Sequence, residues 1–130
     1  MKKIEITKEM RLVETPLDET NVMVNEILAN LFDEGRYEEQ KNESVGFICG
    51  YPSYVYYSEN ELYISHKNIR GGSSFGWFNT IVERLTGNDY EDVSTPLLMG
   101  GYNVLDEDTG LVLTFCVKSD HLIVRFHAKN

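Results

Sequence analysis

The chain has 130 residues, of which 42% are hydrophobic and 25% are charged. A chain of this length can bury the core of one domain and is too short for two full domains. Twelve Lys and Arg against 21 Asp and Glu give a net charge of −9 at pH 7. This charge repels the phosphates of DNA and RNA, so the composition argues against direct nucleic-acid binding and favours a basic partner, or none.

No stretch of the sequence approaches the ~18 apolar residues of a membrane span, and the N-terminus leads into charged alternation rather than an apolar signal peptide. Cys49 and Cys116 lie in apolar surroundings, whereas secreted scaffolds of this size are rich in disulfides. We expect both cysteines to be reduced thiols in the core. The sequence therefore predicts a cytoplasmic protein that makes no contact with membranes.

The first part of the chain predicts a strand, a helix and a loop. Residues 2–13 alternate between apolar and charged side chains, with the period of a half-buried strand, and a break near Lys8 is the alternative to one continuous strand. Thr15-Pro16 is typical of a helix start, and Gly35 would end that helix after about residue 34. The polar and acidic residues 36–44 indicate a loop.

A short apolar strand over 45–49 follows, and Pro52 is expected to end it. Residues 54–58 and 61–66 then flank Glu59-Asn60, where Asn tolerates the positive φ of a tight hairpin. With a two-residue turn, one face of this hairpin carries Val55, Tyr57, Leu62 and Ile64, and the other carries Tyr54, Tyr56 and Tyr63.

The second half of the chain predicts one helix and three strands. Ser73 or Ser74 can cap a helix with an apolar stripe, and Gly87 would end it. An acidic loop with Thr95-Pro96 comes next. Strands are expected over about 102–106, 111–118 and 121–128, joined by tight turns.

These elements follow in the order β-α-βββ-α-βββ. Strands joined by tight turns form antiparallel sheet, and the helices can cover one of its faces. The sequence thus predicts a single α+β domain over residues 1–130, a two-layer sandwich of a mainly antiparallel sheet and two helices.

A weak internal repeat accompanies this order. Asn25-x-Ile27-Leu28-x-x-Leu31 recurs as Asn79-x-Ile81-Val82-x-x-Leu85, and residues 58–62 align with 118–122. Amphipathic helices share a period, which explains part of this match. A true duplication would give a sheet with pseudo-twofold symmetry.

Motifs for catalysis and metal binding are weak. Gly72-Ser73-Ser74-Phe75-Gly76 fits the G-x-S-x-G elbow of serine hydrolases. That elbow needs a parallel sheet with crossover helices, so a serine-capped helix start is the favoured interpretation. His121 and His127 stand about 20 Å apart along one strand and cannot share a metal ion. We therefore expect no enzymatic activity, no metal and no cofactor.

Acidic residues gather in three segments expected to be loops, and tyrosines gather on one face of the first hairpin. Solubility would explain the acidic residues, and packing against the second helix, including Trp77, would explain the tyrosines. The sharper interpretation is a surface that imitates a phosphate array and binds a basic protein. Its candidate residues are Glu34, Glu38, Glu39, Glu43, Tyr54, Tyr56, Tyr63, Asp89, Glu91 and Asp92.

A small-molecule binder is the alternative. Backbone donors at a helix N-terminus, two glycines and a nearby arginine can hold a nucleotide-like anion, and the last hairpin carries a basic strip. A turn and a solvated sheet face explain the same residues without a ligand. The candidate anion-binding residues are Arg70, Gly71, Gly72, Ser73, His121, Arg125 and His127.

The leading hypothesis is a non-enzymatic protein that binds and blocks, or escorts, a basic partner. Phage anti-defence inhibitors of nucleic-acid enzymes and toxin-immunity proteins meet this description, because their targets are positively charged where they hold nucleic acid. The size, acidity and helix-then-three-strand order also resemble type III secretion chaperones, although the closing helix of that family has no counterpart after His127. Pairing of exposed sheet edges would give a homodimer.

Overall fold

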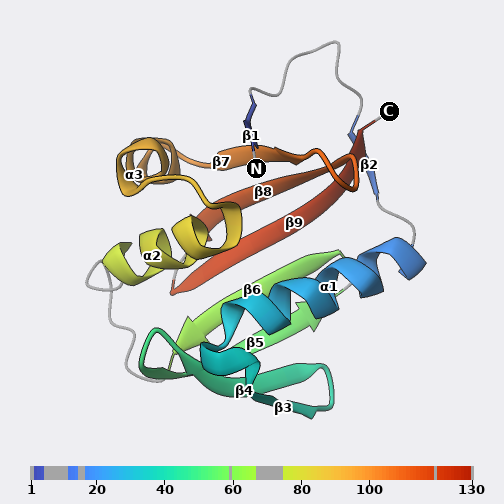
Figure 1. Cartoon of the computed structure of the whole chain (residues 1–130), viewed down its shortest axis with the longest axis vertical. Helices are drawn as coiled ribbons and strands as arrows, with labels where there is room; N and C mark the ends of the chain where they lie inside the picture. Colours follow the sequence, from blue (N-terminus) through green and yellow to red (C-terminus); the bar gives the residue numbers. More distant parts are fainter. Residues whose placement is uncertain are drawn as a thin grey trace.

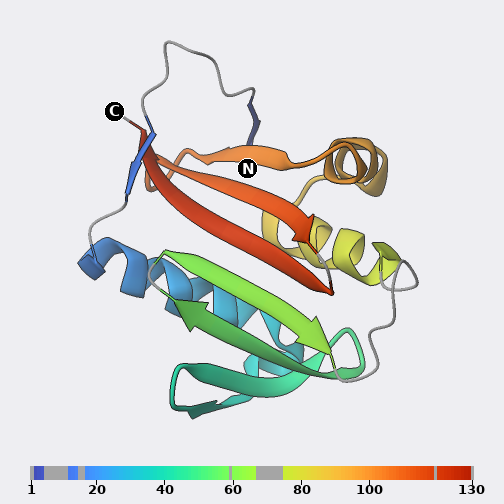
Figure 2. The same cartoon turned by 180° about the vertical axis from the view of Figure 1, so that it is seen from behind.

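The computed structural model describes residues 2–4, 12–14, 17–58, 60–66, 75–118 and 120–129. These residues form two layers, an antiparallel sheet with three α-helices on one of its faces (Figure 1, Figure 2). The helices are α1 (Leu17–Leu31), α2 (Phe75–Thr86) and α3 (Tyr90–Leu98), and a 3-10 helix, η1 (Asp33–Gly35), follows α1. The predicted α+β sandwich is confirmed. In this part of the chain, no helix is long and apolar enough to cross a membrane.

The sheet of the described residues has seven longer strands and two short ones, and all of its pairings are antiparallel. Its order is β1 (Lys2–Lys3), β7 (Tyr102–Asp106), β8 (Leu111–Lys118), β9 (His121–Lys129), β6 (Glu61–His66), β5 (Tyr51–Ser58), β4 (Glu43–Ile48) and β3 (Tyr37–Gln40). The second short strand, β2 (Leu12–Glu14), also pairs with β9. The two halves of the sheet meet where β6 pairs with β9, from Glu61↔Arg125 to Ile64↔Leu122.

The core lies between the helices and the sheet. Alternate side chains of each strand point toward the helices, which is why the period-two pattern identifies the inner face. Val55, Leu62 and Ile64 are buried as predicted, and Tyr57 packs beside them. From the other elements the core receives Ile27, Leu31, Phe78, Ile81, Val82, Leu113, Phe115, Val124 and Phe126.

A third helix, α3, replaces the acidic loop expected before β7. The prediction of two helices is therefore wrong, and so is the predicted order of elements. Pro96 lies inside α3, where proline costs about 3 kcal/mol. Val93 and Leu97, four residues apart, are both buried, and such burial gives about 1.5–3 kcal/mol for each side chain. Tertiary packing thus offsets the proline.

The N-terminal half also differs from the prediction. Over residues 2–13 the described residues form two short strands and not one continuous strand, because β1 pairs with β7 whereas β2 pairs with β9. The first helix ends at Leu31, and η1 covers the following residues. The loop expected over 36–44 is β3 and the start of β4, which Lys41 and Asn42 connect. Asn42 has a φ of 59°, and Asn tolerates this left-handed backbone.

Pro52 lies inside β5 instead of ending β4, so that expectation is also wrong. In β5 it stands opposite Phe47 of β4, whereas the pairing of β5 with β6 reaches only as far as Ser53. Proline has no backbone N–H to donate to a neighbouring strand. Pro52 has a partner in β4 but none in β6, so the missing donor does not interrupt the pairing of β5 with β6.

The two hairpins predicted around residues 59–60 and 119–120 are present as β5–β6 and β8–β9. The strands over 102–106 and 111–118 have the predicted bounds, and β9 runs one residue further than expected. The expected helix start at Thr15-Pro16, the serine cap at 73 or 74 and the turn residues 59 and 119 lie outside the described residues.

The internal repeat stays a prediction. Its 60-residue offset relates Tyr63 to Ile123, and these two residues are paired at the centre of the β6–β9 contact. A twofold axis through that pair would exchange Glu61↔Arg125 with a pairing of residues 65 and 121. The central register is thus compatible with pseudo-twofold symmetry.

His66, at the end of β6, packs between two aromatic rings under α2. Its ring stacks on Tyr51 with centroids 5.0 Å apart and meets the Trp77 ring edge-on at 4.5 Å. Burial lowers the pKa of His66. The unfolded chain therefore takes up a proton at a higher pH than the folded protein, near the ordinary histidine value of about 6.5.

We expect the free energy of unfolding to fall as the pH drops through this range. The variant His66→Phe keeps a ring in the stack and removes the titration. Between about pH 7 and about pH 5, wild type should lose more stability than this variant in urea titrations. Identical pH dependence of the two proteins would contradict the prediction.

Candidate functional site

One face of the sheet points away from the helices (Figure 2), and over β3, β4 and β5 it carries exposed side chains. On β4 and β5, the side chains opposite the core strip alternate onto this face, as the pairing Val45↔Tyr54 shows. Large apolar and aromatic side chains lie here beside carboxylates. We call this surface the tyrosine face and define it by Glu38, Glu43, Val45, Phe47, Tyr54, Tyr56, Tyr63 and His121.

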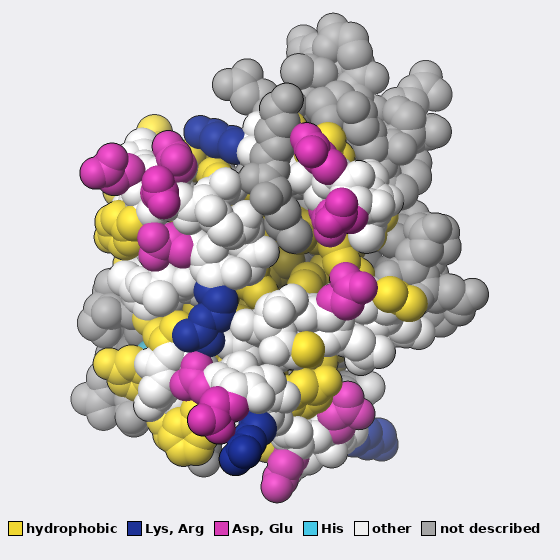
Figure 3. Space-filling view, viewed as in Figure 1, with side chains coloured by type: hydrophobic (Ala, Val, Ile, Leu, Met, Phe, Trp, Pro, Cys, Tyr) yellow, Lys and Arg dark blue, Asp and Glu magenta, His cyan; other side chains and the backbone are white. Residues whose placement is uncertain are grey.

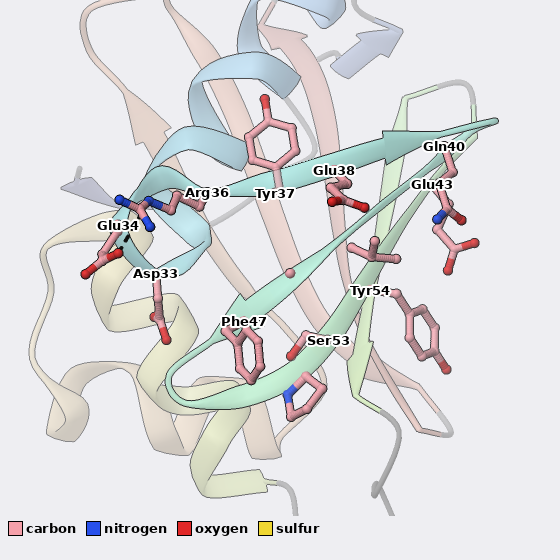
Figure 4. Close-up of a pocket in the computed structure, with 13 residues that line it drawn as sticks. Asp33, Glu34, Arg36, Tyr37, Glu38, Gln40, Glu43, Phe47, Ser53 and Tyr54 are labelled. Carbon is pink, nitrogen blue, oxygen red and sulfur yellow. Dashed lines mark ion pairs between the residues drawn. The ribbon is translucent and has the colours of Figure 1, made fainter.

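An open groove of about 900 Å³ crosses this face over β3, β4 and β5 (Figure 4). Phe47 lies toward one end of the groove, and Glu43 and Tyr54 lie toward the other. Glu38 of β3 stands opposite Val45 of β4 and adds a second carboxylate. The Phe47 side chain is 56% exposed, and an aromatic ring in this position is available for contact with a partner.

A second hollow of about 440 Å³, the aromatic pocket, adjoins the groove because Glu43 and Tyr54 line both. Its other lining residues are Tyr56, Ser58, Tyr63 and His121. The ring centroids of Tyr56 and Tyr63 are 6.0 Å apart. His121 makes T-shaped contacts with Tyr54 and Tyr63, with centroid distances of 6.5 and 6.3 Å. Three separate strands, β5, β6 and β9, therefore bring four rings together.

One ion pair sits at the rim of the pocket. Arg125 Nε lies 2.7 Å from Glu61 Oε1, and the Tyr63 hydroxyl donates a hydrogen bond to Glu61 Oε2. The hydrogen bond to Glu61 raises the pKa of Tyr63, so the phenol stays neutral. The remaining ion pairs of the described residues join Arg36 to Glu34 and Arg84 to Asp33. Within that part of the chain, Glu38 and Glu43 carry charges that no ion pair compensates.

Six of the ten residues predicted to bind a partner line the groove or the aromatic pocket. Glu38, Glu43, Tyr54, Tyr56 and Tyr63 share the tyrosine face. The competing explanation for the tyrosines, packing on the second helix, does not apply to these rings, because α2 covers the opposite face of the sheet.

The sixth residue, Glu34 of η1, lines the groove, where its carboxylate is 3.5 Å from Arg36 Nε and is thus already in an ion pair. The other four predicted residues lie elsewhere. Glu39 stands opposite the buried Ser44 and thus points to the helix side of the sheet. The exposed carboxylates of 89–92 surround the start of α3, where Figure 3 shows a group of acidic side chains.

The residues of the alternative anion site are distributed differently. Arg70, Gly71, Gly72 and Ser73 lie outside the described residues. His121 belongs to the aromatic pocket, and the charge of Arg125 is compensated by Glu61. Burial, and after it the charge of Arg125, lowers the pKa of His127. Of the three candidate residues on β9, His121 thus lines the aromatic pocket and Arg125 is already in an ion pair.

Reactive groups are few in the described residues. They contain no group of three or more His, Cys, Asp and Glu side chains that could hold a metal ion. Cys49 and Cys116 are free, half-buried thiols, and burial raises the pKa of both. Such thiols are poor nucleophiles at neutral pH. Ser74, the serine of the G-x-S-x-G match, lies outside the described residues.

Sequence reasoning missed Phe47 and Glu61 at this site. The apolar run 45–49 suggested a strand buried on both faces, whereas only alternate residues of β4 are buried. The alternation Glu43-Val45-Phe47 was the available signal, because it continues the pattern of a half-exposed strand.

Comparisons of this chain with known protein families, curated proteins and solved structures find no match.

Proposed function

We propose that this chain is a small, acidic, cytoplasmic interaction protein without enzymatic activity, which binds a basic surface of a partner protein and blocks or escorts it. The tyrosine face is the observation that supports this most. There, Glu38 and Glu43, which form no ion pair among the described residues, lie beside aromatic rings in two adjoining hollows. Negative potential steers and orients a basic partner, and aromatic rings supply the contact area of binding hot spots.

A nucleic-acid enzyme is the partner class that fits this chemistry. Such enzymes are positively charged where they hold phosphates, and an acidic protein face that covers that site would compete with the nucleic acid. Inhibition of this kind is what a phage anti-defence protein or a toxin-immunity protein would perform. The alternative, capture of a small anion, draws less support because Arg125 is already paired with Glu61.

A pair of charge-reversal variants tests the proposal. The first carries Glu38→Lys and Glu43→Lys on the tyrosine face. The matched control carries Glu91→Lys and Asp92→Lys at the start of α3, on the helix side of the sheet. Each substitution replaces a negative charge with a positive one and raises the net charge by two. Both double variants therefore change the net charge from −9 to −5. Only the location of the change differs between them.

The measurement is retention of basic proteins from a lysate of the native host by each immobilised variant, quantified at low and at high salt. We expect the tyrosine-face variant to retain at least about fivefold less of a bound partner than wild type, and the α3 variant to match wild type. High salt should weaken retention, since salt screens charges beyond about 8–10 Å. Equal losses in both variants, or retention of acidic proteins regardless of salt, would refute the proposal.

A further inference from the structure

The aromatic pocket has the features of a site for a single cationic side chain. Its walls are the rings of Tyr54, Tyr56, Tyr63 and His121, and Glu43 reaches the same hollow from the start of β4. In the sheet register Glu43 stands directly opposite Tyr56. A carboxylate and the faces of tyrosine rings attract a positive charge, the first by its charge and the second by their quadrupoles.

The rings are held in place before any ligand arrives. Tyr63 donates its hydroxyl hydrogen to Glu61, and Arg125 holds the other oxygen of that carboxylate. The Tyr63 ring in turn lies beside Tyr56 and His121. Glu61 is therefore occupied in fixing the pocket wall, and Glu43 is the carboxylate of the pocket that a ligand can use. A site built in this way loses little conformational freedom on binding.

Two other ligand classes fit the pocket poorly. An anion would meet the charge of Glu43, which lines the pocket outside any ion pair of the described residues, and like charges repel. A neutral apolar group would remove water from Glu43 without compensating its charge, which is costly. Positive charge on the ligand satisfies both the carboxylate and the rings.

We propose that this pocket receives the side chain of an arginine on the surface of the basic partner. The proposal rests on the function proposed above and names the contact at its centre. A guanidinium group is planar and stacks on aromatic faces, and its fork of donors matches a carboxylate, whereas the ammonium of lysine is a strongly hydrated point charge. The hollow of about 440 Å³ opens onto the sheet surface, so a side chain can enter while its backbone stays outside.

The probe is a capped Gly-Arg-Gly peptide, titrated into the full chain and followed by NMR of the tyrosine and histidine rings. Matched peptides replace arginine by citrulline, which has the same shape without the charge, or by lysine. We expect saturable shifts confined to the pocket rings with arginine, none with citrulline, and weaker binding with lysine. Equal responses to arginine and citrulline, or equal or tighter binding of lysine, would overturn the assignment.

Variants at two pocket positions, with a control on α3, locate the interaction. Tyr56 is 46% exposed, so its replacement leaves the core intact, which an unchanged melting temperature will verify. Tyr56→Ala should weaken arginine-peptide binding about two- to fivefold, whereas Tyr56→Phe should retain it because the ring remains. Glu43→Gln should also weaken binding, and Glu91→Gln on α3 should not. Unchanged binding in both Tyr56→Ala and Glu43→Gln would refute the pocket.

The two proposals fail in different ways. If charge reversal on the tyrosine face abolishes partner retention while Tyr56→Ala changes neither retention nor the peptide shifts, the face binds the partner and the arginine pocket is wrong. If the arginine peptide binds the pocket but charge reversal leaves retention unchanged, the proposed function is wrong instead.

Discussion

Replacing Gly46 with alanine should lower the free energy of unfolding by about 1–3 kcal/mol, the usual cost of overpacking. A Cβ atom at this position of β4 would lie 2.7 Å from the backbone oxygen of Arg36 and 2.8 Å from Cδ1 of Phe32. Neither neighbour can retreat easily, because Phe32 is buried and stacks on Tyr37 with centroids 5.2 Å apart. The close approach of η1 and the start of β3 to β4 therefore requires glycine.

Gly76 provides the matched control. It lies in α2, and an added Cβ would meet nothing within 4 Å. Gly76→Ala should leave stability unchanged or raise it by up to about 1 kcal/mol, since alanine favours helix over glycine. Urea denaturation of both variants measures the two effects. A Gly46→Ala variant as stable as wild type would show that β4 and Phe32 are not packed as described.

Replacing Asp33 with alanine should cost about 1–2 kcal/mol of stability, similar to the loss of a strong helix cap. Its carboxylate accepts hydrogen bonds from the backbone nitrogens of Cys49 and Gly50, both at 2.9 Å, and from Arg84 Nη1 at 3.0 Å. Cys49 and Gly50 form the turn between β4 and β5 with φ values of 49° and 82°. Asp33 thus joins the end of α1, a left-handed turn and α2.

The contribution of Asp33 should depend on pH. Burial, the largest single influence, raises the pKa of this carboxyl group, but the hydrogen bonds from Gly50, Arg84 and Cys49 together outweigh it, so the pKa is lowered. A lowered pKa in the folded state means that the stabilisation is complete above the unfolded value of about 3.9 and is lost as the pH falls through the folded value.

Urea titrations of wild type and Asp33→Ala should therefore show a stability difference that is constant near neutrality and shrinks below about pH 4. Glu34→Ala is the control. Its carboxylate is 74% exposed and lies 3.5 Å from Arg36, and exposed pairs of this kind contribute little. Equal effects of Asp33→Ala and Glu34→Ala would contradict the role assigned to Asp33.

The sequence was most informative where side chains alternate and turns are tight. The β5–β6 and β8–β9 hairpins follow from that pattern, and with them the placement of Tyr54, Tyr56 and Tyr63 on one face. β3 escaped prediction because an edge strand needs little apolar character: Glu38, Glu39 and Gln40 are all exposed. α3 was not predicted because Pro96 and the acidic residues before it are typical of a loop. Its two buried side chains, Val93 and Leu97, are too few to give a clear helical pattern.

The tyrosines of the candidate site could be predicted for the same reason. Within a hairpin the period of the strand decides which side chains are neighbours, so the tyrosines could be grouped from the sequence. Which acidic segment lies beside them depends on how β3, β4 and α3 are placed in three dimensions. Local charge density does not contain that information, and for this reason Asp89, Glu91 and Asp92 joined Glu38 and Glu43 in the prediction although the fold separates them.

The pairing of β1 and β2 has a consequence for the order of folding. Most ladders join strands that are close in sequence, whereas β1–β7 and β2–β9 join residues roughly a hundred positions apart. Closing so long a loop costs conformational entropy, and the two or three residue pairs of each ladder offset little of it. We therefore expect β1 and β2 to pair only after β7, β8 and β9 have assembled. The N-terminal strands should thus dock last, and amide protons there should exchange with solvent sooner than those of β8 and β9.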